Sequence, residues 1–371
     1  MKKLLLSVIS LVLLLGLVTP TAAQFGWLPK AGVTPDSPFY FLDQWGEGIS
    51  MAFTFSNEAK AKKALRFSEE RLAEMKTMSE KGKTKQAEKA AEKYQQALNS
   101  VQKRSEQTKE DQKRGKVTAQ VASSTSKHLS VLEETLGKVP EEARSALKKA
   151  KESSKQGHMQ ALESLSKTNP DEAAKIGAKS LQQRLEEIEQ VTVTNATTAK
   201  QLQRVESITK DFQDLSKGFK EMTQNSNRIE VQEIVGSSTS QHIETLRGVY
   251  EKVPQAAKES IQKAIDVSEQ GRERAMEALR NASEKGQKGA GEALDRVEGL
   301  TPPGGAPSQG DSTTSGPTPD QPDSQPGPQQ QSEQSGQSES QETPGLEPSG
   351  EQTDQDTDEQ PSETPGGGPG M

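Results

Sequence analysis

Val121-Ala-Ser-Ser-Thr-Ser-Lys-His128-Leu-Ser-Val-Leu132 returns about 114 residues later as Val235-Gly-Ser-Ser-Thr-Ser-Gln-His242-Ile-Glu-Thr-Leu246. The correspondence needs no gap over roughly 45 residues, a length that covers two helical segments. It includes the matching tripeptides Lys138-Val139-Pro140 and Lys252-Val253-Pro254. The offset is the length of one small domain. The sequence therefore predicts two tandem copies of one structural unit.

Residues 57–285 have the pattern of amphipathic helices. Ala, Lys, Glu, Gln and Leu dominate, prolines are scarce, and apolar or small residues recur in steps of three and four. In the repeated segment these positions are Val117, Val121, Thr125, His128, Leu132 and Leu136, and in its copy Val235, Thr239, His242, Leu246 and Val249. Because the breaks between segments are short, neighbouring helices should run antiparallel. The predicted fold is all-α, with two tandem antiparallel helical-bundle or hairpin units and a disordered C-terminal tail.

Glycine and proline mark the expected helix ends. Gly82 follows the first segment and can end its helix in a left-handed conformation. Gly115 is expected to separate the second segment from the third. Pro140 and Pro254 should open the fourth helix of each copy, where a missing N–H costs nothing. Asn169-Pro170 should divide the two copies.

The N-terminus has the pattern of a signal peptide. Lys2 and Lys3 precede an apolar run from Leu4 to Val18, and small residues end at Ala23. We expect cleavage after Ala23 and no transmembrane span in the mature chain, since the run is shorter than the ~20 residues that a span needs. The predicted boundaries are a signal peptide over 1–23, an aromatic lead segment over 24–56, a first helical unit over 57–168, a second over 169–286 and a tail over 287–371.

The tail and the body differ in composition. Residues 301–371 contain 13 acidic residues, no Lys or Arg and almost no large apolar side chain. Such a segment cannot bury enough apolar surface to offset the entropy of ordering, so we expect disorder over 287–371. The body carries acids and bases in near balance, which indicates a solvated helical surface and no nucleic-acid partner. The chain has no cysteine, which excludes disulfides, thiolate metal sites and cysteine nucleophiles.

The lead segment carries a recognisable pattern. Pro35-Asp36-Ser37-Pro38-Phe39-Tyr40-Phe41-Leu42-Asp43-Gln44-Trp45 is followed by a helix that contains Arg71-Leu72-Ala73-Glu74-Met75. This arrangement resembles the bacterial and archaeal family known as domain of unknown function 5667, over about residues 35–165, with a diverged second copy over 170–280. Asp43 and Gln44 stand where that family is expected to have a basic residue. The resemblance implies an exported or envelope-facing all-helical protein and implies no substrate, cofactor or catalytic residue.

His128 and His242 occupy equivalent places, each three residues after Thr125 or Thr239 on the inner helix face. We expect buried, hydrogen-bonded polar pairs that set the helix register; the alternatives are a metal ligand or a pH sensor. Neither histidine lies in a metal-binding motif. The Ser and Thr residues before each histidine lack the glycine elbow of a nucleophile. The sequence therefore predicts no catalytic, cofactor-binding or metal-ligating residue, and no cofactor.

Eight aromatic residues gather between Phe25 and Phe55. Phe41, Trp45, Ile49 and Phe53 recur at every fourth position and should share one helix face. The whole candidate interaction or packing face comprises Phe39, Tyr40, Phe41, Trp45, Ile49, Phe53 and Phe55. We expect the four periodic residues to pack on the first copy, near Leu65, Phe67 and Leu72. The alternative is a surface for a membrane or a partner.

These patterns favour a non-enzymatic function. We expect an exported structural or interaction protein, secreted or associated with the cell envelope, whose partner is an envelope protein or polymer. The alternative is an extracytoplasmic sensor or binding module for a ligand, cation or envelope polymer, with a groove between the copies as its site. The sequence names neither the partner nor the oligomeric state.

Overall fold

The computed structural model describes residues 25–193 and 198–300, and within these ranges it contains ten α-helices and no strand. The all-α prediction is confirmed. The helices are α2 (Tyr40–Ala52), α3 (Asn57–Glu80), α4 (Thr84–Glu106), α5 (Asp111–Lys138), α6 (Glu141–Ser166), α7 (Pro170–Val193), α8 (Ala199–Thr223), α9 (Ile229–Lys252), α10 (Gln255–Glu284) and α11 (Ala290–Glu298). The predicted signal peptide over 1–23 and the tail from residue 301 lie outside the described residues.

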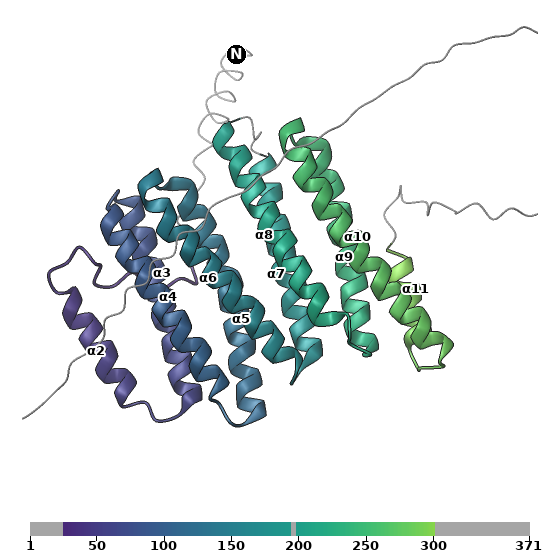
Figure 1. The fold of residues 1–371 in the computed structure, drawn as a ribbon, viewed down its shortest axis with the longest axis horizontal. Coiled ribbons are helices and arrows are strands. Elements are labelled where there is room, and N and C mark those ends of the chain that lie inside the picture. Colours follow the sequence, from purple (N-terminus) through teal and green to yellow (C-terminus); the bar gives the residue numbers. More distant parts are fainter. Residues whose placement is uncertain (1–24, 194–197, 301–371) are drawn as a thin grey trace, which may run out of the picture. The chain divides into compact units, whose positions relative to one another are not determined.

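The helices form an array of hairpins (Figure 1). Each of α3, α5, α7 and α9 pairs with the helix that follows it. The first helices of the hairpins also pack on one another in chain order, as do the second helices, so the array has two layers. Of the two arrangements left open by the sequence, the hairpin array is the one that forms.

Both ends of the array carry an additional helix. At the N-terminal end, α2 is tied to α3 by a hydrogen bond between Tyr40 and Glu74. At the C-terminal end, α11 packs on α9 and α10 and buries Ala290, Ala293 and Val297. The expectation that disorder begins at residue 287 is therefore wrong up to residue 300. The composition of this segment did not predict the helix, because only three small apolar residues on one face are needed to dock its nine residues on the array.

The helix ends follow local chemistry. Ser56 caps α3 by accepting a hydrogen bond from the backbone N–H of Ala59. Thr198 and Gln201 form a capping box at the start of α8. Gly82 has φ +67°, the left-handed conformation that was expected. Gly115 does not separate two helices, since α5 begins at Asp111 and the break lies at residues 107–110.

The two copies share one contact between their third and fourth helices. Thr125 and Thr239 each donate a hydrogen bond to the carbonyl four residues earlier, at 2.7 Å. Their methyl groups then face Gly157 and Gly271, where an added Cβ would stand 3.7 Å and 3.2 Å away. A threonine and a glycine therefore meet at the same place in each copy, which explains why both residues recur in the repeat.

A tighter approach occurs at Gly177 in α7, and it predicts opposite effects for two glycine substitutions. A Cβ at Gly177 would lie 2.5 Å from the buried ring of Phe219, so Gly177→Ala should destabilise the fold by about 1–3 kcal/mol. Gly248 in α9 has no atom within 4 Å of an added Cβ. Gly248→Ala should instead stabilise by about 0.5–1 kcal/mol, because alanine favours a helix. Urea unfolding followed by circular dichroism measures both; equal effects would show that the Phe219 ring moves aside freely.

Candidate functional site

A buried arginine holds the lead helix on the array. Arg71 of α3 is 3% exposed and places its Nη2 atom 2.8 Å from Glu74, 2.9 Å from Glu47 and 3.3 Å from Asp43. Its Nη1 atom donates to the hydroxyl of Tyr40, which in turn donates to Glu74 at 2.8 Å. Three side chains of α2 therefore converge on one guanidinium.

The carboxylates around Arg71 outnumber it. Burial raises the pKa of Glu74 to about 8 and that of Glu47 to about 7, although Arg71 opposes both shifts. Burial also raises the pKa of the Tyr40 hydroxyl. The charged side of α2 is thus turned toward α3, where Asp43 and Glu47 are half-buried against Arg71.

This anchoring contradicts the expected packing of the aromatic face. Tyr40, Asp43 and Glu47 lie along one side of α2, so the side with the large apolar residues is turned outward. Phe41, Trp45, Ile49 and Phe53 are 64%, 70%, 41% and 74% exposed. They do not pack near Leu65, Phe67 and Leu72. Periodicity grouped these residues on one face correctly, but it could not show that a polar contact would decide which face turns inward.

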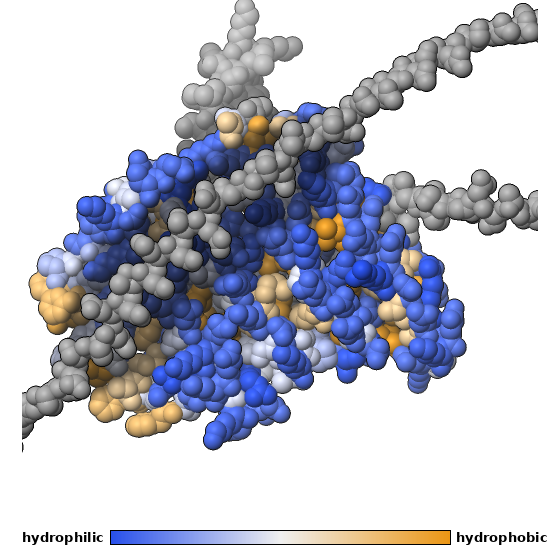
Figure 2. Space-filling view, viewed as in Figure 1, coloured by the Kyte–Doolittle hydropathy of each residue, from blue (hydrophilic) through white to orange (hydrophobic). Residues whose placement is uncertain are grey.

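The exposed apolar surface extends beyond those four residues. Phe39 and Phe55 are also exposed, as is Leu42, whereas Tyr40 is buried. Figure 2 shows hydrophobic residues at the end of the array where Figure 1 places α2. We call the exposed residues Phe39, Phe41, Leu42, Trp45, Ile49, Phe53 and Phe55 the α2 face. Other lead residues, Phe25, Trp27 and Leu28, supply the large side chains that pack on the first copy.

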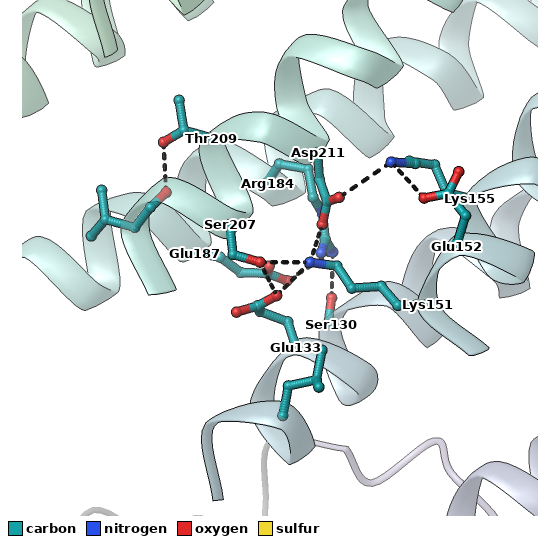
Figure 3. Close-up of polar contacts among 12 residues, drawn as sticks. Ser130, Glu133, Lys151, Glu152, Lys155, Arg184, Glu187, Ser207, Thr209 and Asp211 are labelled. Atoms are coloured by element: carbon teal, nitrogen blue, oxygen red, sulfur yellow. Dashed lines mark hydrogen bonds and ion pairs between the residues drawn. The ribbon is translucent and has the colours of Figure 1, made fainter. Parts of the chain in front are cut away.

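The second copy has the equivalent arginine at the junction between the copies. Arg184 of α7 is fully buried, pairs with Glu187 at 2.8 Å and donates to the hydroxyl of Ser130 in α5 at 2.5 Å (Figure 3). Arg71 with Glu74, and Arg184 with Glu187, have the same spacing in sequence. The aligned Arg-Leu dipeptides were visible in the sequence, but nothing there marked these arginines as buried.

A second ionic cluster lies beside this junction. Lys151 of α6 contacts Glu133 of α5 at 2.5 Å and Asp211 of α8 at 2.6 Å. Ser207 of α8 donates to Glu133 at 3.0 Å (Figure 3). Lys155 pairs with Asp214 at 2.8 Å. Burial alone would lower the pKa of Lys151, but the two carboxylates outweigh it and raise that pKa. These ion pairs link α6 of the first copy to α8 of the second.

A groove of about 620 Å³ opens over this cluster. Its walls come from α5, α6 and α8, so it lies between the two copies. Eight Lys and Arg side chains and five carboxylates line it, which leaves an excess of positive charge.

The histidines are buried in both copies but differ in their partners. His128 Nδ1 lies 3.0 Å from the hydroxyl of Tyr94, and its ring stacks on Trp27. His242 meets the edge of Phe212 at 5.5 Å between ring centroids, and its Nδ1 has no hydrogen-bond partner among the described residues. Burial lowers the pKa of both histidines to about 3. Both are therefore neutral at physiological pH.

Over 25–193 and 198–300, no three His, Cys, Asp or Glu side chains are grouped to hold a metal ion. In the same ranges, no helix has both the length and the apolar character needed to cross a bilayer.

Comparison with known proteins identifies one family. Residues 32–142 match the family described as Domain of unknown function (DUF5667), which confirms the resemblance from the lead segment to the first residues of α6. The match does not include the second copy. No curated protein and no solved structure shows significant similarity to the chain. The family description names no activity.

The unequal partners of the two histidines predict unequal effects of removing them. At pH 7, His128→Leu should destabilise the fold by about 1–3 kcal/mol, because the Tyr94 hydroxyl loses a buried partner. His242→Leu should cost less, because its Nδ1 atom gives up no hydrogen bond to the described residues. Denaturant unfolding at pH 7 measures both, and Tyr94→Phe in the His128→Leu background should recover part of the loss. A larger cost for His242→Leu would contradict this assignment.

The same His242→Leu variant has a predicted pH dependence. The folded-state pKa of His242 is about 3, below the ordinary 6.5, so its contribution to stability is present above pH 6.5 and is lost as the pH falls. Between pH 7 and pH 5 the variant should therefore gain about 2 kcal/mol relative to the unsubstituted protein. An unchanged difference between the two proteins would mean that His242 titrates normally.

Proposed function

We propose that this chain is an exported, non-enzymatic structural or interaction protein of the cell envelope, and that the α2 face is its binding surface. The observation that carries the proposal is the outward orientation of this face. The N-terminal signal-peptide pattern supports export, and the family resemblance supports an envelope-facing role.

The size of the α2 face favours a role in binding. Five of its residues are aromatic, and they are between 63% and 89% exposed. Aromatic side chains bury about 150–250 Å² each, so these five offer on the order of 500–900 Å². The largest apolar patch on a typical monomer is about 300–600 Å². An apolar surface of this extent is characteristic of an interface.

The attachment of α2 also favours a role in binding. Arg71 ties the helix to α3 through Glu47 and Asp43, and Lys63 of α3 donates to Ser50 and Thr54 near the other end of α2. A face held at several points along its length is pre-organised, and it loses less conformational entropy when it binds.

Site-specific photo-crosslinking on intact cells tests this proposal. A photoreactive phenylalanine analogue at position 41 should give a covalent adduct in the envelope or extracellular fraction, because position 41 lies in the α2 face. The matched control is the same analogue at Val193, which is 72% exposed at the end of α7. Equal adduct yields at the two positions, or protein confined to the cytoplasm, would contradict the proposal.

The groove between the copies supports a second candidate function, a binding module for an acidic envelope polymer. Its excess of Lys and Arg would attract polyanions in a salt-dependent manner. The groove is formed by residues of both copies, so ligand binding would depend on the junction.

A charge reversal in the groove tests this second function. Lys210 of α8 lines the groove, whereas the exposed Lys217 of the same helix does not. Lys210→Glu should weaken binding of polyglutamate at low salt about fivefold, because it replaces an attraction with a repulsion. Lys217→Glu should have less effect. Calorimetric titration measures both, and equal weakening would show only non-specific attraction to a cationic surface.

A further inference from the structure

We propose that the α2 face binds the α2 face of a second copy of this chain, which gives a two-fold symmetric homodimer joined at the N-terminal ends of two arrays. This inference rests on the proposed function, because it names the partner of the same surface.

The position of α2 in the array shows why its outer face requires a partner. Arg184 of α7 is covered by α5, the helix that precedes α7 in the first layer. Arg71 of α3 is covered in the same way by α2. The lead helix therefore supplies polar partners to Arg71, as α5 does to Arg184. Within the described residues, α5 is covered on its far side by α3, whereas nothing covers the far side of α2.

The area of the face fits a dimer interface. The aromatic residues of the face offer on the order of 500–900 Å² of apolar area. This area is comparable with the ~800 Å² that each partner buries in a standard stable interface. Gly46 and Gly48 are exposed on α2 and have no atom within 4 Å of an added Cβ. They leave room beside Trp45 for the aromatic rings of a partner.

The charges at the two ends of the array favour contact between two α2 helices over contact between α2 and α11. Asp43 and Glu47 are the only charged residues of α2, and both are paired with Arg71. Both lie on the side of α2 that is turned toward Arg71, away from the exposed aromatic residues, so two α2 faces can meet without bringing these carboxylates together. The exposed residues of α11 at the opposite end include Glu292, Asp295, Arg296 and Glu298. Contact between α2 and α11 would bury these charges against apolar rings, which is costly.

Other occupants fit less well. Residues 301–371 contain no cluster of large apolar side chains that could cover the face. A membrane surface is disfavoured because residues 31–59 contain no Lys or Arg to bind anionic headgroups. A second copy needs no cation and supplies the matching apolar surface.

Sedimentation of the mature chain, residues 24–371, tests the proposal. The protein should have twice the monomer mass at micromolar concentrations, and Trp45→Ser should raise the dissociation constant at least tenfold. Trp45 is 70% exposed, so this substitution should leave the circular dichroism spectrum and melting temperature unchanged. Val193→Ser, at a similarly exposed apolar site, should leave the dimer intact.

Disulfide trapping tests the symmetry, and the absence of native cysteine makes it unambiguous. Gly48→Cys lies in the middle of α2 and should form a covalent dimer on mild oxidation. Gly248→Cys is equally open but lies on α9, and it should remain monomeric under the same conditions.

The outcomes separate this inference from the proposed function. A dimer that Trp45→Ser weakens and Gly48→Cys traps supports both. A monomer at all concentrations whose Trp45 binds phosphatidylcholine vesicles overturns the dimer but leaves the α2 face as an interaction surface. The same holds if the crosslink at position 41 joins a different protein. A monomer that binds no vesicles and forms no crosslink overturns both.

Discussion

The buried arginine–glutamate pair at the start of each copy is the constraint on which the arrangement depends. Arg71 and Arg184 each have a glutamate three residues later on their own helix, at 2.8 Å. A buried guanidinium left without partners would cost several kcal/mol. Each copy therefore needs a preceding element that supplies oxygen atoms. For the second copy that element is α5, and for the first copy it is α2. This explains why the chain has one lead segment although it has two copies.

The same constraint accounts for the orientation of α2. A helix with one apolar and one polar side normally turns its apolar side inward. Here the polar side carries Asp43 and Glu47, which the guanidinium of Arg71 requires. Phe25, Trp27 and Leu28 of the lead segment meanwhile pack, partly buried, against the core of the first copy. The aromatic side of α2 is left at the surface as a result, and this is why the proposed function centres on it.

The two copies have diverged where their neighbours differ. Tyr94 and Phe212 meet the equivalent histidines, but only the tyrosine provides a hydroxyl for Nδ1. Burial keeps both imidazoles neutral, whether or not a hydroxyl meets Nδ1. The threonine–glycine contacts are preserved in both copies because each joins the third and fourth helices of its own copy. The threonine–glycine contact is thus shared by the two copies, whereas the ring that meets the histidine differs between them.

Sequence periodicity, turn residues and the internal repeat were enough to predict an all-α chain of antiparallel helices, and to group Phe41, Trp45, Ile49 and Phe53 on one face. These features are local: they depend on spacing along one helix or on the conformation of one residue such as Gly82. The tertiary structure decided the hairpin array, the helix α11 and the outward orientation of the α2 face. It also brought Lys151, Glu133 and Asp211 together from three helices. These features depend on which distant side chains satisfy a buried charge, and a pattern along one helix carries no information about partners that lie far away in the chain.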